Sequence, residues 1–195
     1  MKPENTFDPI LHRYTIAGRP VPSVTQVLRD LIPGWSASDW YLERGRAVHM
    51  AAAFIARNKS FDWDPQIEGQ VAALRRFFTE VKPVVVETEF PVYSARYQYA
   101  GTLDLLVDGR QNVIADFKSA LTSAVPYQLA AYALAQNEMG FPIVGRGYGV
   151  EIRENGTYKM SEVYDLRKYQ QDWLNLLGSY NVRRKCGIKQ MEDAA

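Results

Sequence analysis

The chain has 195 residues, 47% of them hydrophobic, and its 23 basic side chains nearly balance its 22 acidic ones. That length suffices for one globular domain with a buried core, and the net charge of +1 excludes a protein that grips polyanions through its overall charge. The lone cysteine, Cys186, excludes an internal disulfide and an iron–sulfur cluster held by several thiolates. Because no segment has the apolar core of a signal peptide or the roughly 20 apolar residues of a membrane helix, we expect a soluble cytoplasmic protein.

The first segment, residues 11–31, predicts a small hairpin followed by a helix. The hairpin turns around Ala17-Gly18, and Ser23 is the expected cap of the helix. The apolar residues of this helix repeat at helical spacing and are Val24, Val27, Leu28 and Leu31.

Two further helices are expected before Pro83. One begins near residue 36, with Ser36 or Ser38 as its cap, and runs to about residue 58. The other covers about residues 66–81, and it ends there because the residue before a proline is disfavoured in a helix.

The hydrophobic period then changes from helical to alternating. Residues 84–92, 99–107 and 112–118 are expected as strands, and a turn that contains Asp108-Gly109 joins the last two. A helix over residues 125–139 follows them, ended by a glycine and a proline.

The last part of the chain predicts two more strands, at residues 144–152 and 156–164, and a closing amphipathic helix that leads to a basic tail. The apolar stripe of this helix comprises Leu166, Tyr169, Trp173, Leu176, Leu177 and Tyr180. The order helix, three strands, helix, strand in the middle of the chain predicts an α/β (α+β) fold in which helices flank a central mixed sheet.

The two central strands carry Asp104 and Asp116 within apolar sequence. Side chains alternate between the two faces of a strand. Every second residue is apolar in 103–107 (Leu103, Leu105, Val107) and in 113–117 (Val113, Ala115, Phe117), so both of these sets must face the core. This requires an odd loop centred on Arg110, which places Asp104 opposite Asp116. A two-residue Asp-Gly turn would separate the carboxylates across the sheet and is rejected.

Like charges on directly opposed strand residues are destabilising, so a cation should compensate them. Lys118 shares a face with Asp116, and a divalent cation that bridges the carboxylates would compensate more of the charge. Glu87 and Glu89 of the preceding strand also share a face, and alternation does not separate them. The alternative is a hairpin whose carboxylates simply face solvent, with Lys118 in a surface ion pair.

These residues form part of a longer series of motifs. "GTLD" at residues 101–104 is followed twelve residues later by "DFK" at 116–118, and "QLAAY" at 128–132 lies in the next helix. Upstream, "GRAVH" at residues 45–49 reads as a helical Gly-x-x-x-His motif. In this order the motifs resemble those of the PD-(D/E)XK nuclease superfamily, specifically its RecB-like and phage-exonuclease branch. The resemblance implies the restriction-endonuclease-like αβββαβ core.

The resemblance also implies roles for individual residues. The metal ligands that it implies are His49, Asp104, Asp116 and the backbone carbonyl of Phe117. The catalytic residues that it implies are Glu89, Asp104, Asp116 and Lys118, with Glu87 as the alternative to Glu89. The substrate and DNA contacts that it implies are Ser119, Gln128 and Tyr132. His12 lies outside these motifs and is expected to be a surface residue.

Carboxylate oxygens suit Mg²⁺ or Mn²⁺, which lower the pKa of bound water and neutralise charge on the phosphorane and the leaving oxygen. An imidazole ligand suits Mn²⁺ somewhat better than Mg²⁺. Lys118 would position or deprotonate the attacking water. With one cysteine the chain cannot belong to the relatives that carry an iron–sulfur cluster, and without a P-loop it would act as a free-standing nuclease.

The resemblance therefore implies a divalent-metal-dependent DNA exonuclease used in phage or prophage recombination or DNA processing, in the host cytoplasm if it is phage-encoded. A structure-specific or site-specific endonuclease and a catalytically silent DNA-binding module are the alternatives. DNA is the expected partner, and a homo-oligomer or a phage recombination protein are further candidates. We expect a single nuclease domain, with an N-terminal part over residues 1–82, a catalytic core over 84–163 and a C-terminal helix and tail over 165–195.

Overall fold

The computed structural model describes residues 5–8, 11–31, 39–108, 112–140 and 144–188. The helices are α1 (Val24–Leu31), α2 (Asp39–Ala56), α3 (Glu68–Val81), α4 (Val125–Glu138) and α5 (Gln170–Lys185), with the short 3₁₀ helices η1 (Pro65–Ile67) and η2 (Leu166–Tyr169). The strands are β1 (Thr6–Asp8), β2 (Arg13–Ile16), β3 (Arg19–Val21), β4 (Val84–Ser94), β5 (Tyr99–Asp108), β6 (Asn112–Lys118), β7 (Val144–Ile152), β8 (Tyr158–Met160) and β9 (Tyr164–Asp165). Among the helices of these ranges, none has both the length and the apolarity that crossing a bilayer requires.

The N-terminal hairpin and the cap of α1 confirm the prediction. Strands β1, β2 and β3 form a small antiparallel sheet, and Ala17 and Gly18, with φ of 55° and 73°, make the two-residue turn between β2 and β3. Ser23 Oγ accepts from the Gln26 amide at 3.1 Å, while the Ser23 amide donates to Gln26 Oε1 at 2.8 Å. This reciprocal pair is a capping box, which satisfies backbone donors at the start of α1.

The next two helices are present, and the first turn of the second one differs from the expectation. The proposed caps Ser36 and Ser38 lie outside the described residues. Helix α3 starts two residues late because the 3₁₀ helix η1 occupies the expected first turn. Lys82, in the left-handed conformation at φ 49°, ends α3 directly before Pro83, as predicted.

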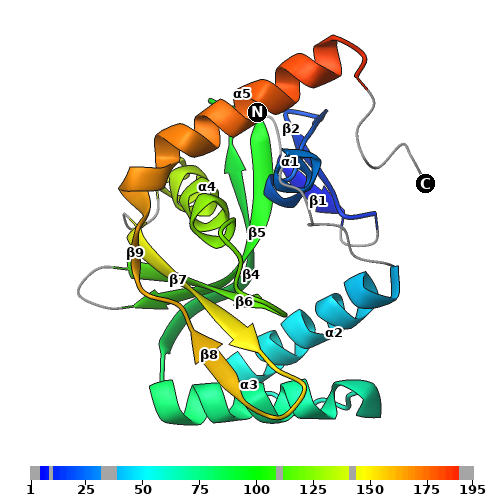
Figure 1. Cartoon of the computed structure of the whole chain (residues 1–195), viewed down its shortest axis with the longest axis vertical. Coiled ribbons are helices and arrows are strands. Elements are labelled where there is room, and N and C mark those ends of the chain that lie inside the picture. The colour runs from blue at the N-terminus through cyan, green and yellow to red at the C-terminus, as the bar shows by residue number, and fades with distance from the viewer. Residues whose placement is uncertain (1–4, 9–10, 32–38, 109–111, 141–143, 189–195) are drawn as a thin grey trace.

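The central sheet has the strand order β4-β5-β6-β7-β8, and β9 also pairs with β7. Only β6 and β7 run parallel among the described strand pairs, and α4 is the crossover between them. The succession α3, β4, β5, β6, α4, β7 confirms the predicted αβββαβ order and the mixed sheet flanked by helices (Figure 1).

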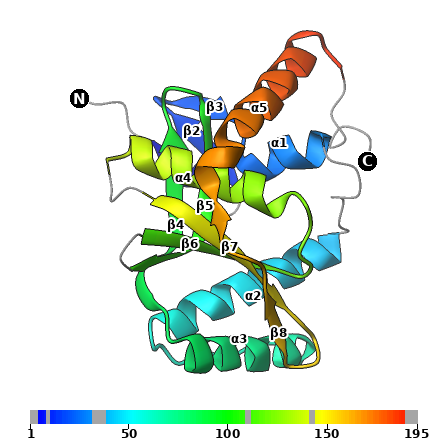
Figure 2. The ribbon, with the colours of Figure 1, turned by 60° about the vertical axis from the view of Figure 1, so that its left-hand side comes forward.

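Helices cover both faces of this sheet. Figures 1 and 2 show α4 and α5 on one side and α2 and α3 on the other. On the first side, Leu106 and Ile114 are buried with residues of α1, α4 and α5, including Trp173. On the second side, Leu105 is buried with Phe77 of α3. Both faces of the central hairpin are therefore packed in apolar cores, whereas one polar face was expected from the sequence.

The register of the central hairpin is as predicted. Leu105 pairs with Ala115, Leu106 with Ile114 and Val107 with Val113, so that continuation of the same register brings Asp104 opposite Asp116. The turn at residues 109–111 lies outside the described residues.

The predicted face of Leu103 is wrong. Leu105 and Val107 pack toward α2 and α3, but Leu103 packs with the residues around α4. The neighbouring strand β4 has two irregularities near this point. Its register against β5 shifts between Val85 and Glu87, and Glu89 has a left-handed φ of 50°, which we call the bend in β4, between the pairs Thr88–Leu105 and Phe90–Leu103. A left-handed residue interrupts the alternation of a strand, and Asp104 on β5 lies directly beside this interruption.

Candidate active site

Three side chains from three elements converge beside the bend in β4. His49 comes from α2, Glu89 from β4 and Asp104 from β5, and one potential ligand atom of each lies within 4.8 Å of the other two. His49 Nδ1 lies 2.9 Å from Asp104 Oδ1 and 3.8 Å from Glu89 Oε1. One imidazole nitrogen and two carboxylate oxygens can thus meet at a single ion.

Asp116 and Lys118 form a second, adjoining pair at the end of β6. The Asp116 carboxylate is buried, and its Oδ2 forms an ion pair with Lys118 Nζ. Asp104 links this pair to the first group, because its Oδ2 accepts a 2.6 Å hydrogen bond from the amide of Phe117. Asp116 is not one of the three residues whose ligand atoms lie within 4.8 Å. The structure therefore groups Glu89, and not Asp116, with His49 and Asp104.

The alternative of a solvent-facing hairpin is wrong. Asp104 is 5% exposed and Asp116 is 1% exposed, because helices cover both faces of the strands that carry them. Buried carboxylates require hydrogen bonds or opposite charges, and here His49, Lys118 and a backbone amide supply them.

The charges of the site shift the pKa of the imidazole and of its partner in opposite directions. Burial lowers the pKa of His49, but the charge of Asp104, its hydrogen bond and the charge of Glu89 outweigh burial and raise the pKa to about 9. Burial raises the pKa of Asp104, yet His49, Lys118 and the Phe117 amide outweigh it and lower the pKa below its ordinary value. In the metal-free chain, His49 and Asp104 thus form an ion pair at neutral pH.

The two remaining carboxylates lack full compensation. Burial and then repulsion from Asp104 raise the pKa of Glu89 to about 7, against the opposing charges of His49 and Arg57. Burial raises the pKa of Asp116 and outweighs the opposing charge of Lys118, and with a smaller contribution from the charge of Asp104 the pKa is about 6. Burial and repulsion between neighbouring carboxylates thus raise both pKa values, and a bound cation would relieve that repulsion.

Gln128 and Tyr132 lie on α4, one turn apart, and Gln128 Nε2 donates to Tyr132 Oη at 2.8 Å. The Tyr132 ring packs on β5 at Gly101, where a Cβ would lie only 2.5 Å from Tyr132 Cε1. The glycine of "GTLD" thus permits the close approach of the tyrosine of "QLAAY". Both side chains are buried and do not lie on an exposed surface.

The remaining predicted residues surround the end of β6. Ser119 follows Lys118 and is exposed. The Phe117 ring is buried edge-on against Phe77 of α3, with ring centroids 5.6 Å apart. Its packing holds the strand between Asp116 and Lys118, and ligation by its carbonyl stays a prediction.

Arg57 was not expected at the site from the sequence, and it directly follows the end of α2, eight residues after His49. One guanidinium nitrogen of Arg57 donates to the Thr88 carbonyl at 2.9 Å, at the residue before Glu89. This bond holds the backbone at the bend that turns Glu89 toward His49. Because Arg57 lies beyond the end of the helix and bonds a backbone carbonyl of another element, no local sequence pattern marks it.

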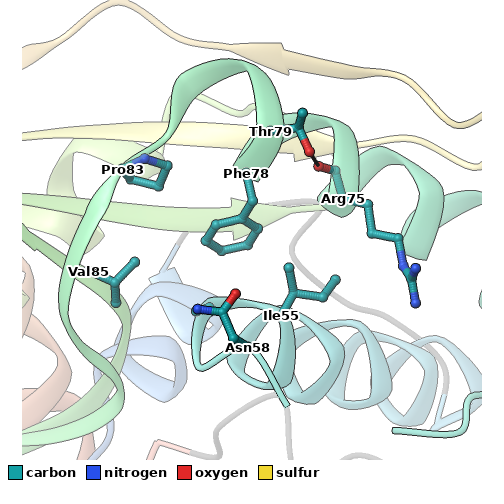
Figure 3. Close-up of a pocket in the computed structure, with 8 residues that line it drawn as sticks. Ile55, Asn58, Arg75, Phe78, Thr79, Pro83 and Val85 are labelled. Carbon is teal, nitrogen blue, oxygen red and sulfur yellow. Dashed lines mark hydrogen bonds between the residues drawn. The ribbon is translucent and has the colours of Figure 1, made fainter. Parts of the chain in front are cut away.

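The site is distinct from a cavity of about 480 Å³ between the end of α2, α3 and β4. Figure 3 shows Phe78 and Val85 among its lining residues, and Thr79 Oγ1 donating to the Arg75 carbonyl at 2.8 Å. None of the predicted site residues lines this cavity.

No protein-family model and no curated protein matches the sequence. Among solved structures, the alkaline exonuclease LHK-Exo from Laribacter hongkongensis is similar, with a TM-score of 0.42 and 12% identity over 85% of this chain and 92% of that chain. LHK-Exo in complex with dAMP is similar with a TM-score of 0.42 and 11% identity over 86% of this chain and 93% of that chain. At these values the likeness identifies no activity, so the function is inferred from the side chains of the site.

Proposed function

We propose that the chain is a single-domain, divalent-metal-dependent DNA nuclease of the PD-(D/E)XK superfamily that acts as an exonuclease. The observation that carries the proposal is the convergence of His49, Glu89 and Asp104 within 4.8 Å, next to the buried pair of Asp116 and Lys118. The exonuclease mode is supported by the resemblance of the ordered motifs to the phage-exonuclease branch.

The donor set fits Mg²⁺ or Mn²⁺. Both ions take carboxylate oxygens, and Mn²⁺ also accepts an imidazole nitrogen readily. The pKa of Glu89 is raised to about 7 by burial and by like charge, so a cation at this position would relieve a repulsion that is already present. We propose His49, Glu89 and Asp104 as the residues that hold the ion. When bound, it would lower the pKa of a water molecule and neutralise charge on the scissile phosphate.

The other groups of the site prepare the geometry and the charge. Asp104 orients the His49 ring through one carboxylate oxygen and ties β5 to β6 through the other. Asp116 holds Lys118 Nζ next to the carboxylates, where the ammonium group would orient the attacking water or stabilise the charge that develops on the phosphate. The hydrogen-bonded pair of Gln128 and Tyr132 packs on β5 at Gly101 and would support this arrangement.

A digestion assay tests the proposal. Linear, closed circular and single-stranded DNA are incubated with the wild type in Mg²⁺, Mn²⁺ or EDTA, alongside Asp116→Ala and Lys118→Ala. Lys159→Ala, at an exposed position of β8, is the matched control. We expect metal-dependent degradation of linear DNA that both site variants abolish and the control preserves.

Each contrary outcome has a definite meaning. Nicking of closed circles would replace the exonuclease with the endonuclease alternative. DNA binding without cleavage in either metal would favour the silent module. Cleavage by Lys118→Ala at the wild-type rate would overturn the role of the lysine.

A further inference from the structure

Helix α2 presents His49 to the candidate active site, but apolar packing holds only one part of this helix. Val48 and Ala51 are buried with residues of α3 in the core on that side of the sheet. The described residues that precede them, 43–46, are polar or glycine and are not among the apolar residues of that core. His49 therefore lies near the end of the apolar contact, and the preceding turn of α2 depends on other interactions.

Arg44, five residues before His49, supplies such an interaction. Its Nη2 donates to Glu154 Oε1 in the turn between β7 and β8, where the two side chains form an ion pair. Gln70 of α3 is a second partner, because its amide satisfies both of its polar atoms when the oxygen faces Arg44. That oxygen then accepts from Arg44 Nε at 3.2 Å and also from Nη2, while the amide nitrogen donates to the Ile67 carbonyl at 3.3 Å. The Arg44 side chain is only 15% exposed, and it joins α2 to two other elements.

The turn that receives Arg44 is itself fixed on α3. A Cβ on Gly69 would lie 1.7 Å from the Glu154 carbonyl oxygen, so a glycine is required where the turn rests on the first turn of the helix. Near the other end of α3, Tyr158 Oη of β8 donates to Glu80 Oε2 at 2.8 Å. Figures 1 and 2 both show β8 beside α3. The hairpin of β7 and β8 therefore provides a fixed anchor for Arg44.

The same hairpin continues into the sheet of the candidate active site. Strand β7 pairs with β6 so that Gly149 lies beside Asp116. Arg44 thus connects the helix that carries His49 with the strand next to the one that carries Asp116. A guanidinium group suits this role, because its planar fork bonds several acceptors in a fixed geometry, whereas an ammonium group sits on a flexible stem.

We propose that Arg44 is a positioning residue, which sets α2 so that the His49 imidazole reaches the ion held with Glu89 and Asp104. The inference rests on the proposed nuclease function and deepens it by naming the residue that places the metal ligand of α2. Arg44 acts through the helix, because its guanidinium group bonds the β7–β8 turn and α3 and so fixes the part of α2 that apolar packing leaves unsupported.

Two variants and a control test the positioning role. Arg44→Met keeps a long side chain with high helix propensity but loses the charge and the donors, and Arg44→Lys keeps the charge without the planar fork. Arg76→Met is the control, because it removes the exposed ion pair with Glu80 within α3. Calorimetry measures Mn²⁺ binding at a temperature at which thermal unfolding shows each protein to be folded. Pulsed electron paramagnetic resonance of bound Mn²⁺, in protein labelled with nitrogen-15 histidine, detects a ligating imidazole. The chain has two histidines, so His49→Ala identifies the signal of His49.

The expected results separate positioning from a merely structural role. Arg44→Met should weaken Mn²⁺ binding about tenfold, as does the loss of other groups that orient a metal ligand, and it should reduce the imidazole coupling. Arg44→Lys should bind Mn²⁺ more tightly than Arg44→Met and more weakly than the wild type, and Arg76→Met should match the wild type. A purely structural role would lower the Tm of Arg44→Met but leave the Mn²⁺ affinity and the imidazole coupling of the folded protein unchanged, and that result would overturn the proposal. Should Arg44→Met fail to fold, wild-type affinity and coupling in Arg44→Lys would overturn it.

Failure of the proposed function gives a different result. If the wild type binds no Mn²⁺ or shows no imidazole coupling, the metal site is wrong and the role of Arg44 falls with it. If the wild type binds Mn²⁺ through His49 but cleaves no DNA, the proposed nuclease fails, while the comparison of Arg44→Met with the wild type still decides whether Arg44 positions the ligand. If the wild type cleaves DNA and Arg44→Met keeps the wild-type Mn²⁺ affinity and coupling, the nuclease stands and the positioning role is wrong.

Discussion

Gly101→Ala tests the contact between β5 and α4 that holds the candidate active site together. A Cβ on Gly101 would lie 2.5 Å from Tyr132 Cε1, 3.2 Å from Tyr132 Cδ1 and 3.3 Å from Val24 Cγ2. Carbon atoms in contact prefer about 3.5–4.0 Å, so the buried Tyr132 ring would have to move by about 1 Å. Overpacking of this kind costs about 1–3 kcal/mol of unfolding free energy, and each kcal/mol lowers the Tm by about 2–4 °C in a domain of this size.

Thermal and urea unfolding followed by circular dichroism measure this cost. Gly178→Ala on α5 is the matched control, because a Cβ there has no neighbour within 4 Å and alanine should stabilise the helix by about 1 kcal/mol. In the Tyr132→Ala background the cost of Gly101→Ala should fall, since the ring that the new methyl group meets is gone. A Gly101→Ala variant as stable as the wild type, or a cost that persists without the Tyr132 ring, would refute the packing argument.

Three further predictions concern the metal and the bend in β4. At pH 7.5 the metal-free wild type should release about one proton per Mn²⁺ bound, because the pKa of His49 is about 9 and ligation requires the neutral ring. Calorimetry in two buffers of different ionisation enthalpy measures the proton release, and equal binding heats in the two buffers would contradict the prediction. Glu89→Gln should weaken Mn²⁺ binding but raise the unfolding free energy of the metal-free chain by about 1–2 kcal/mol above pH 7. This value allows for screening by solvent, because the Glu89 side chain is 35% exposed. The folded pKa of Glu89 is raised to about 7, so its ionisation destabilises the fold as pH rises, and the gain from glutamine should vanish near pH 4.5. Arg57→Gln should lower the unfolding free energy by about 1 kcal/mol and weaken Mn²⁺ binding, because the hydrogen bond to the Thr88 carbonyl beside the bend in β4 is lost. An unchanged Mn²⁺ affinity in calorimetry would argue against a positioning role of Arg57.

The order of elements could be predicted because each depends on local signals. Ala17-Gly18 marks the hairpin, Ser23 with Gln26 marks the start of α1, and Pro83 marks the end of α3. The register of the central hairpin also followed from the sequence, because a slip by one residue would have exposed an apolar set.

Which residues make up the site was harder to predict from the sequence, because the site depends on one backbone feature that has no sequence signal. Glu89 adopts a left-handed conformation that is uncommon for residues other than glycine, asparagine and aspartate. Alternation also failed at Leu103, which lies near this residue on the neighbouring strand. It could not separate Glu87 from Glu89, because residues two apart share a face of a regular strand. His12 was correctly expected at the surface, but its aromatic neighbours Phe7 and Tyr14 lie on β1 and β2, and no local pattern predicts these contacts.

Two unfavourable features meet at Glu89. A left-handed residue other than glycine is strained, and burial among like charges raises the pKa of Glu89 to about 7. Neither stabilises the fold, and a glycine or a neutral residue would avoid at least one of them. Arg57 compensates part of the cost through the Thr88 carbonyl, which keeps the carboxylate turned toward His49 and Asp104. Strain of this kind persists where the surrounding structure imposes it and is concentrated at functional sites. The cost at Glu89 is therefore best explained by the ion that the three side chains would hold, since a bound divalent cation removes the charge repulsion that makes the metal-free arrangement expensive.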